Sequence, residues 1–362
     1  MYYKLFAPRT FVSLIIALAY IQKRRGQNIL LLNTNSIKKK LIVKMKPYLS
    51  KYFLEIHFFK YDEYKSSGGL ISRHFYIYKF IKKKLSNKVL KKIAEKKISH
   101  IYGGGNFLEE IFSIILKKKP RFYFLEHGIG NILNFTEENK IFRSSYYLCL
   151  RLLKIKYFSP VKFIKYIGLF CGPVRKKIYI NGSETPAYTI KNFRRILMDL
   201  KSFVKIREKI KNGNKNNLVF LNINNLKMNK TNDFNDLIER MLKLITNNET
   251  ILVKEHPNNL NYHKTFKFFK KILKKNNNKL IILDRYYEKN LPIEVFIEKF
   301  KIKKIISLIS AVPLYSSILF KNVENHIFIN YSIKYPVKKG INEFSIKNKK
   351  FYIESFPKIA YH

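Results

Sequence analysis

The chain alternates short apolar runs that favour strands with longer stretches whose apolar residues have helical spacing. Strand-type runs at 2–6, 121–125 and 304–306, for example, stand among helix-type stretches such as 11–21 and 107–116. Such alternation is typical of βαβ units, in which helices connect parallel strands. Because it continues through both halves of the chain, we predict an α/β protein built on doubly wound parallel sheets.

One polar stretch interrupts this alternation, Lys-Asn-Gly-Asn-Lys-Asn-Asn at 211–217, and the pattern restarts after it. A chain of 362 residues also exceeds one typical hydrophobic core. We therefore predict two Rossmann-like domains facing a cleft, one over 1–211 and one over 212–330. The basic segment 331–362 is expected to close the fold or to pack back on the N-terminal domain.

The formal net charge is +48, from 72 Lys and Arg residues against 24 Asp and Glu residues. A balance this basic favours nucleic acid, anionic lipid headgroups or an acidic polymer as a partner. The lysines are nevertheless spread along the whole chain, and the bias toward Lys, Ile, Asn, Phe and Tyr is that of an AT-rich genome. Two interpretations of the excess positive charge stay open: the basic residues form a solvated surface, or they form a surface that binds a polyanion.

Two segments, 76–97 and 141–171, interleave basic residues with apolar and aromatic ones. In the first, apolar residues from Ile77 to Ile93 recur at spacings of three and four. Such a stripe is typical of a surface helix packed on a core, and it also suits a helix lying on an anionic membrane. The apolar segment 11–21 is too short to span a bilayer. It also lacks the basic start of a secretory signal, so we expect a buried first helix.

The cysteines and histidines do not indicate a metal site. Cys149 and Cys171 are too far apart for a CxxC unit, and the eight histidines are scattered. We therefore expect a reduced, cytosolic protein that needs no metal or other cofactor.

The first candidate functional stretch follows the strand predicted at 121–125. Glu126 and His127 arrive at the end of this strand, and Gly128 leaves room beside them. An earlier strand runs into a glycine-rich turn that contains Gly104 and Asn106, and such turns aim backbone amides at an anion. Both stretches are also compatible with ordinary turns.

The second candidate stretch is Lys254-Glu255-His256-Pro257, after the strand-type run 251–253. Proline disfavours the helical region for the residue before it, so His256 is expected to be held extended at the strand's end. Ligands of open α/β sheets bind outside the carboxyl ends of the strands. Ser307 and Ser310, which follow the run 304–306, are placed in the same way.

These residue types suit group transfer from a nucleotide-activated donor. The Glu126 carboxylate can take the proton from an acceptor hydroxyl as that oxygen attacks. His256 can stabilise or protonate the leaving phosphate, and the Ser310 hydroxyl with the amides of a following helix can bind it. No DxD pattern is present, which agrees with a metal-independent reaction.

The ordered set Glu126-His127-Gly128, His256-Pro257 and Ser310 resembles the motifs of bacterial sialyltransferases and polysialyltransferases. Those families carry an acidic-acidic-Gly motif, a His-Pro motif and a serine motif in this order. This sequence differs from the family motifs at two positions. His127 stands where the first motif usually has a second acid, and Ala311 stands where a second Ser or Thr is common.

This resemblance implies a glycosyltransferase B-type (GT-B) fold, a CMP-sialic acid donor and no metal. It makes the first domain the acceptor side and the second the nucleotide-donor side. It further implies a general base at Glu126, acid assistance at His256 and phosphate binding at Ser310, with Ser307, Lys254 and Pro257 nearby. The acceptor would be a capsule or lipooligosaccharide glycan or a lipid-linked glycan, at the inner face of the bacterial inner membrane.

Two alternatives stay open. Glycerol- and ribitol-phosphate polymerases also resemble this pattern, with a CDP-linked donor, and His127 could supply the additional histidine of their sites. A basic nucleic-acid-binding protein would be of a different class. Trp is absent and no RNP, KH or zinc-finger signature is present, so no nucleic acid is expected as a partner.

Overall fold

The computed structural model divides into two compact units, Met1–Phe193 and Arg194–His362. The described residues are 1–21, 26–34, 37–60, 79, 82–83, 86–103, 108–126, 148, 150–152, 163–169, 187–203, 218–222, 232–254, 278–283, 290–308, 310–329, 349–350, 352–354 and 356–362.

The boundary between the units falls within helix α9 (Ala187–Leu200). The sequence predicted it at 211/212, in a polar run that lies outside the described residues.

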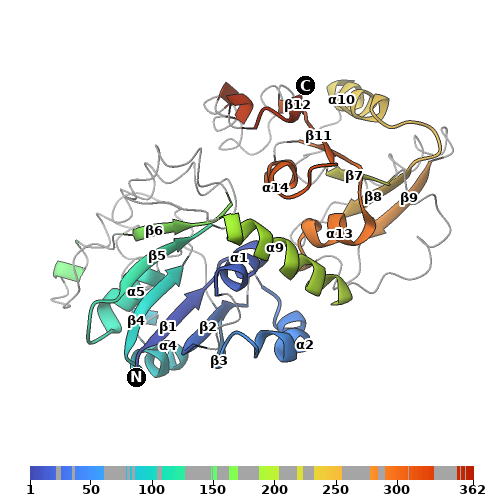
Figure 1. Ribbon diagram of the computed structural model, residues 1–362. Coiled ribbons are helices and arrows are strands. Elements are labelled where there is room, and N and C mark those ends of the chain that lie inside the picture. Colours follow the sequence, from blue (N-terminus) through green and yellow to red (C-terminus); the bar gives the residue numbers. More distant parts are fainter. Residues whose placement is uncertain are drawn as a thin grey trace. The chain divides into compact units, whose positions relative to one another are not determined.

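The first unit is built on a six-stranded parallel sheet with the order β3-β2-β1-β4-β5-β6 (Figure 1). Its strands are β1 (Tyr3–Ala7), β2 (Asn28–Asn33), β3 (Glu55–Phe59), β4 (Ile98–Gly103), β5 (Arg121–Leu125) and β6 (Phe163–Ile167). Helices α1 (Phe11–Ile21), α2 (Lys39–Leu49), α4 (Lys88–Ala94) and α5 (Leu108–Ile115) connect or flank them.

The two faces of this sheet have different side chains. One face joins apolar residues of β1, β2, β4 and β5 to buried residues of α4 and α5, including Ile93 and Phe112. On the other face Phe6, Tyr102 and Tyr123 occupy neighbouring strands and stack in a row, with centroid distances of 4.3 and 4.7 Å. Tyr20 of α1 contacts this row through Tyr102. Branched and aromatic residues therefore fill both layers around the sheet.

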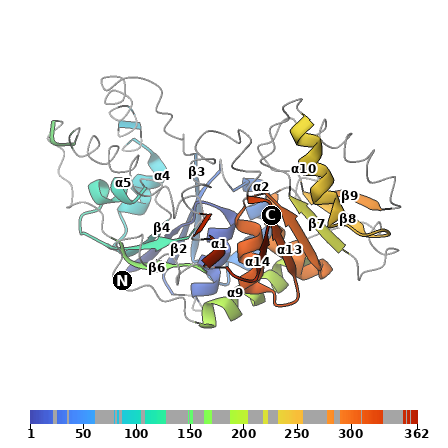
Figure 2. The same ribbon diagram turned by 90° about the horizontal axis from the view of Figure 1, so that it is seen from above.

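The second unit repeats the architecture with the order β12-β11-β10-β7-β8-β9, again all parallel. Its strands are β7 (Leu218–Asn222), β8 (Thr250–Lys254), β9 (Lys279–Leu283), β10 (Lys304–Ser307), β11 (Glu324–Ile327) and β12 (Ile359–Tyr361). Its helices are α10 (Asn232–Lys243), α13 (Ile293–Phe300) and α14 (Ala311–Leu319), with a short 3-10 helix η1 (Lys201–Phe203). Leu237 and Met241 of α10 pack against buried residues of β7 and β8. Figure 2 shows α10 beside these strands.

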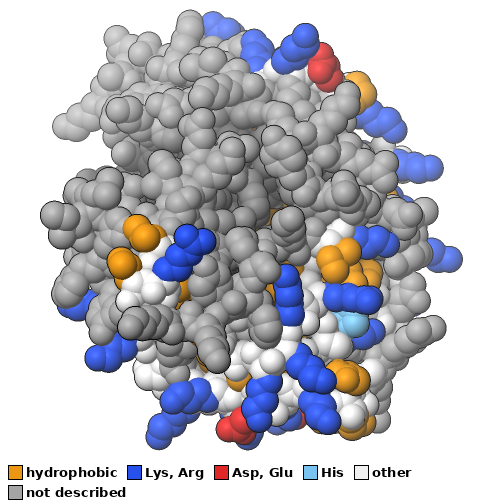
Figure 3. All heavy atoms as spheres, turned by 90° about the vertical axis from the view of Figure 1, so that its left-hand side faces the viewer, with side chains coloured by type: hydrophobic (Ala, Val, Ile, Leu, Met, Phe, Trp, Pro, Cys, Tyr) orange, Lys and Arg blue, Asp and Glu red, His pale blue; other side chains and the backbone are white. Residues whose placement is uncertain are grey.

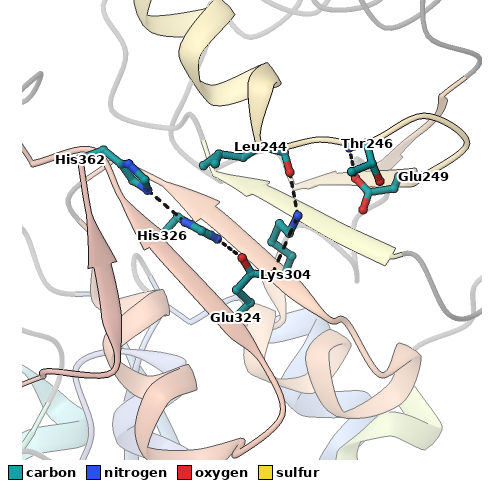
Figure 4. Close-up of polar contacts among 7 residues, drawn as sticks. All are labelled: Leu244, Thr246, Glu249, Lys304, Glu324, His326 and His362. Atoms are coloured by element: carbon teal, nitrogen blue, oxygen red, sulfur yellow. Dashed lines mark hydrogen bonds and ion pairs between the residues drawn. The ribbon is translucent and has the colours of Figure 1, made fainter.

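Side-chain hydrogen bonds hold the C-terminal strand β12 in place, in addition to its backbone pairing with β11. His326 of β11 contacts His362, the residue after β12, and the other ring nitrogen of His326 bonds Glu324 (Figure 4). The Tyr361 hydroxyl donates to the Tyr352 carbonyl at 2.8 Å. The end of segment 331–362 thus belongs to the second sheet, and its packing on the first unit stays a prediction.

The structure describes part of each of the two basic segments, and in 76–97 it agrees with the first of the two interpretations, a helix packed on a core. In 76–97, Leu90 and Ile93 of α4 are fully buried against the sheet, so this part of the stripe is core rather than membrane surface. In 141–171, residues 163–167 form strand β6, because Phe, Ile and Tyr suit a pleated sheet better than a helix. None of the described helices is both long and apolar enough to cross a membrane.

Lysine and arginine side chains are dispersed over the described surface seen in Figure 3, with few acidic ones among them.

Candidate active site

Both sheets have the strand order of a Rossmann fold, in which the chain reverses direction across the sheet between its first and fourth strands. In the first unit this switch point lies between β1 and β4, and in the second between β7 and β10. Glu126 follows β5, next to β4, and Ser307 ends β10 itself. Lys254 ends β8, which neighbours β7. Glu126, Lys254 and Ser307 therefore lie at the carboxyl ends of strands, where ligands of such sheets bind.

Glu126 is held at the end of β5 by the neighbouring strand. Its backbone N–H donates to the Ile167 carbonyl at 3.0 Å, which extends the β5–β6 ladder by one residue. Its side chain is fully buried, and the Tyr166 hydroxyl donates a short hydrogen bond to Glu126 Oε2. The backbone of Glu126 is thus fixed by β6, and its carboxylate is fixed by the Tyr166 hydroxyl.

Gly168 lies directly against this carboxylate. A Cβ atom added to Gly168 would be 2.1 Å from Glu126 Oε2 and 2.5 Å from Glu126 Cβ. Because such contacts are far shorter than any real Cβ contact, only glycine fits opposite Glu126 without a shift of the carboxylate.

In the second unit the charge of Lys254, at the end of β8, acts on a buried acid. Glu294, in the first turn of α13, is 2% exposed. Burial raises the pKa of Glu294 to about 7, while its own backbone hydrogen bond and the charge of Lys254 act in the opposite direction. Burial therefore outweighs the favourable charge of Lys254, and the Glu294 carboxyl holds its proton to a higher pH than an exposed one does.

The two predicted serines have different surroundings. Ser310 is the N-cap of α14, and its Oγ accepts from the Val312 N–H at 3.2 Å. The Ser310 hydroxyl hydrogen is not used in that bond. Ser307 is fully buried, and its hydroxyl donates to the Leu308 carbonyl at 2.5 Å. Ser310 is therefore the better placed of the two to donate to a phosphate.

Several predicted site residues lie outside the described residues. They are Gly104, Asn106, His127, Gly128, His256 and Pro257. Within the described part of the chain, no group of three or more His, Cys, Asp or Glu side chains could hold a metal ion.

Three residues near these strand ends were not singled out from the sequence. Tyr166 and Gly168 stand in a stretch interpreted as amphipathic, where nothing in the sequence marks them as partners of Glu126. Glu294 follows Leu291-Pro292-Ile293, and an acid in the first turn after a proline normally serves the helix itself. Only the strand order brings Tyr166 and Gly168 beside Glu126.

Comparison with known families decides what kind of protein carries this arrangement. The model of the alpha-2,8-polysialyltransferase (POLYST) family matches residues 10–327, which include Glu126, Lys254 and Ser310 and every strand of the two sheets except β1 and β12. The chain belongs to this family. The resemblance predicted from the sequence motifs is thereby confirmed, and this polysialyltransferase-family chain is a sialyltransferase-type glycosyltransferase.

Solved structures agree with the fold. UDP-GlcNAc 2-epimerase from Neisseria meningitidis, bound to UDP-GlcNAc, is 10% identical, with a TM-score of 0.51 over 99% of this chain and 93% of that chain. UDP-N-acetylglucosamine 2-epimerase from Rickettsia bellii is 14% identical, with a TM-score of 0.45 over 88% of this chain and 77% of that chain. At such identities the likeness concerns the fold alone, and the likeness to the Neisseria enzyme, together with the two parallel sheets, confirms the predicted GT-B-type α/β class. A search of curated proteins finds no match.

Proposed function

We propose that this chain transfers sialic acid from CMP-sialic acid to a surface glycan. The observation that carries the proposal is the family match over residues 10–327, which spans the three motif regions. The family description points to an α2,8 linkage, and hence to an acceptor that already ends in sialic acid. The UDP-GlcNAc bound to the Neisseria epimerase supports a nucleotide-sugar site in this fold.

The acceptor half of the reaction is assigned to Glu126. The carboxylate accepts the proton of an acceptor hydroxyl while that oxygen bonds to the sialyl carbon. In the same step the bond from this carbon to the CMP phosphate oxygen breaks. Glu126 is fully buried in this structure, so the base role requires that acceptor binding opens a path to the carboxylate.

The donor half is assigned to the second unit. His256 protonates or stabilises the departing phosphate oxygen, and Lys254 contributes positive charge beside it. The Ser310 hydroxyl and the first amides of α14 bind the same phosphate, because a helix N-terminus favours anions. Pro257 and Ser307 are assigned to the same donor-binding part of the site. The reaction proposed here uses no metal.

We also propose that the acceptor is a capsule or lipooligosaccharide glycan, free or lipid-linked, and that the enzyme works in the cytoplasm at the inner face of the inner membrane. The net charge of +48 supports contact with an anionic lipid surface or with the polyanionic product. Binding to vesicles of phosphatidylglycerol, compared with phosphatidylcholine, tests the membrane part.

The rates of transfer from CMP-sialic acid and from CDP-glycerol distinguish the two candidate donors. The purified chain is incubated with a sialylated oligosaccharide and either CMP-sialic acid or CDP-glycerol, with EDTA present in parallel reactions. We expect turnover of CMP-sialic acid alone, at an unchanged rate with EDTA. Transfer from CDP-glycerol instead would establish the polyol-phosphate alternative.

Glu126→Gln tests the base. The amide keeps the shape of the carboxylate and cannot accept the proton, so we expect a fall in kcat of about 100-fold or more. Thermal shift with CMP should be the same in both proteins, because the nucleotide is assigned to the second unit. Activity near the original level in Glu126→Gln would remove Glu126 from the mechanism.

A further inference from the structure

We propose that Tyr166 is the positioning residue of Glu126, and that Gly168 supplies the space in which the carboxylate lies. This inference rests on the proposed function, since it assigns a role to the contacts of the general base. It concerns strand β6, to which neither the sequence motifs nor the family match assigns a role.

The pairing of β5 with β6 brings the three residues together. Phe124 pairs with Tyr166 and Leu125 with Ile167, so the next step of the register sets Glu126 opposite Gly168. Because side chains alternate along a strand, Tyr166 and Gly168 lie on the same face as Phe124 and Glu126. Gly168, across from Glu126, thus has no side chain, and Tyr166, two positions earlier on β6, reaches the carboxylate with its hydroxyl.

The Tyr166 ring is itself held in place. It is 2% exposed and stacks on the Phe124 ring at a centroid distance of 5.7 Å and an interplanar angle of 12°. A stacked, buried ring has few rotamers available, so its hydroxyl points to one position. That position is Glu126 Oε2, to which the hydroxyl donates.

A donor at this position has a chemical consequence for a buried base. Burial disfavours the charged form of a carboxylate, whereas a hydrogen bond donated to that form favours it. The phenol therefore helps to keep Glu126 ionised, which a base must be before it accepts a proton. It also fixes one carboxylate oxygen, so that the orientation of the other is defined.

Because Gly168 lies so close to Glu126, any side chain added at position 168 would displace the carboxylate. With Glu126 Oε2 only 2.1 Å from an added Cβ, even alanine would force the carboxylate away from the Tyr166 hydroxyl. Gly26 offers a matched control in the same unit, because a Cβ added there meets nothing closer than Asn28 Oδ1 at 3.7 Å.

The central experiment is the pH–rate profile of Tyr166→Phe. This variant keeps the ring stacked on Phe124 and removes only the hydroxyl. We expect kcat to fall about 10- to 100-fold with KM for CMP-sialic acid unchanged, in line with the loss of one hydrogen bond to a charged group. The acidic limb of the profile should move to higher pH, because the ionised carboxylate loses its donor.

Tyr123→Phe is the control for removal of a phenol from β5 and β6. Tyr123 lies on the opposite face of β5, in the row with Phe6 and Tyr102. Its removal should leave both kcat and the acidic limb unchanged. Gly168→Ala should lower kcat as Tyr166→Phe does, while Gly26→Ala should not.

Measured together with Glu126→Gln, these variants separate the two proposals. If Glu126→Gln stays active, the proposed base is wrong. If Glu126→Gln is inactive while Tyr166→Phe has an unchanged pH profile, Glu126 remains the base and the positioning role of Tyr166 is overturned. Failure of Tyr166→Phe to fold, judged by circular dichroism, would likewise assign Tyr166 a structural role and overturn the inference.

Discussion

His326 Nδ1 lies 3.0 Å from His362 Nε2, and this contact connects β11 to the residue that follows β12. The other ring nitrogen of His326 donates to Glu324 Oε1 at 2.7 Å, so His326 Nδ1 accepts from His362 Nε2–H when both rings are neutral. The His362 ring also stacks on Phe328 at 4.7 Å. Lys304 Nζ lies 3.9 Å from Glu324 Oε2 and donates to the Leu244 carbonyl (Figure 4).

This contact predicts a loss of stability in acid. Burial, and then the charge of His326, lower the pKa of His362 below 6.5 in the folded protein. As the pH falls below 6.5, His362 therefore takes up a proton in the unfolded chain before it does so in the folded protein. The free energy of unfolding decreases over this range and stops decreasing below the pKa of His362 in the folded protein. Well above pH 6.5 His362 is neutral in both states, so its titration does not change the free energy of unfolding.

His362→Gln checks this prediction by urea unfolding of both proteins at pH 7.5 and pH 5.5. The variant should lose less stability between the two pH values than the original protein. Equal losses would show that His362 does not contribute.

Glu294 predicts the opposite pH dependence. Its pKa is raised from 4.5 to about 7 by burial, so the folded protein holds a proton that the unfolded chain has already lost. The free energy of unfolding should fall as pH rises from about 4.5 to about 7, by on the order of 3 kcal/mol, and be flat above. In Glu294→Gln, which is neutral at every pH, this slope should be absent and the protein should be more stable at pH 8. A variant less stable than the original at pH 8 would contradict the prediction.

Ser310 has two predicted roles that substitution can separate. Ser310→Ala removes the N-cap of α14 and should cost about 1 kcal/mol of stability. Ser310→Asp keeps a capping acceptor but sets a negative charge beside the proposed phosphate. Its stability should stay close to the original while the thermal shift produced by CMP is lost. A CMP shift retained in Ser310→Asp would exclude Ser310 from the donor site.

The buried part of the 76–97 stripe gives a further prediction. Ile93 is fully buried among residues of β1, β2 and α5, so Ile93→Ala should cost about 2–5 kcal/mol in unfolding free energy. Lys92→Ala, on the exposed side of α4, should leave stability unchanged. If Ile93→Ala unfolded like the original protein and lost only vesicle binding, the membrane interpretation of this helix would be correct.

Much of the architecture was predictable because strand and helix periods are local properties. The strands predicted near 2–6, 121–125, 251–253 and 304–306 lie within a residue or two of their observed bounds. Strand β11, Glu-Asn-His-Ile, was missed since its polar residues do not mark a strand. Strand β6 was missed because its lysine and aromatics also suited an amphipathic segment.

The sequence by itself determined the α/β class, the family motifs and the strand ends after which Glu126, Lys254 and Ser310 lie. These follow from short-range patterns of apolar, glycine and proline residues. Only the tertiary structure decided what surrounds those residues: Tyr166 and Gly168 beside Glu126, and the buried Glu294 within reach of the charge of Lys254. The physical reason is that hydrogen bonding between strands distant in the chain, rather than any local preference, sets which side chains meet at the edge of a parallel sheet.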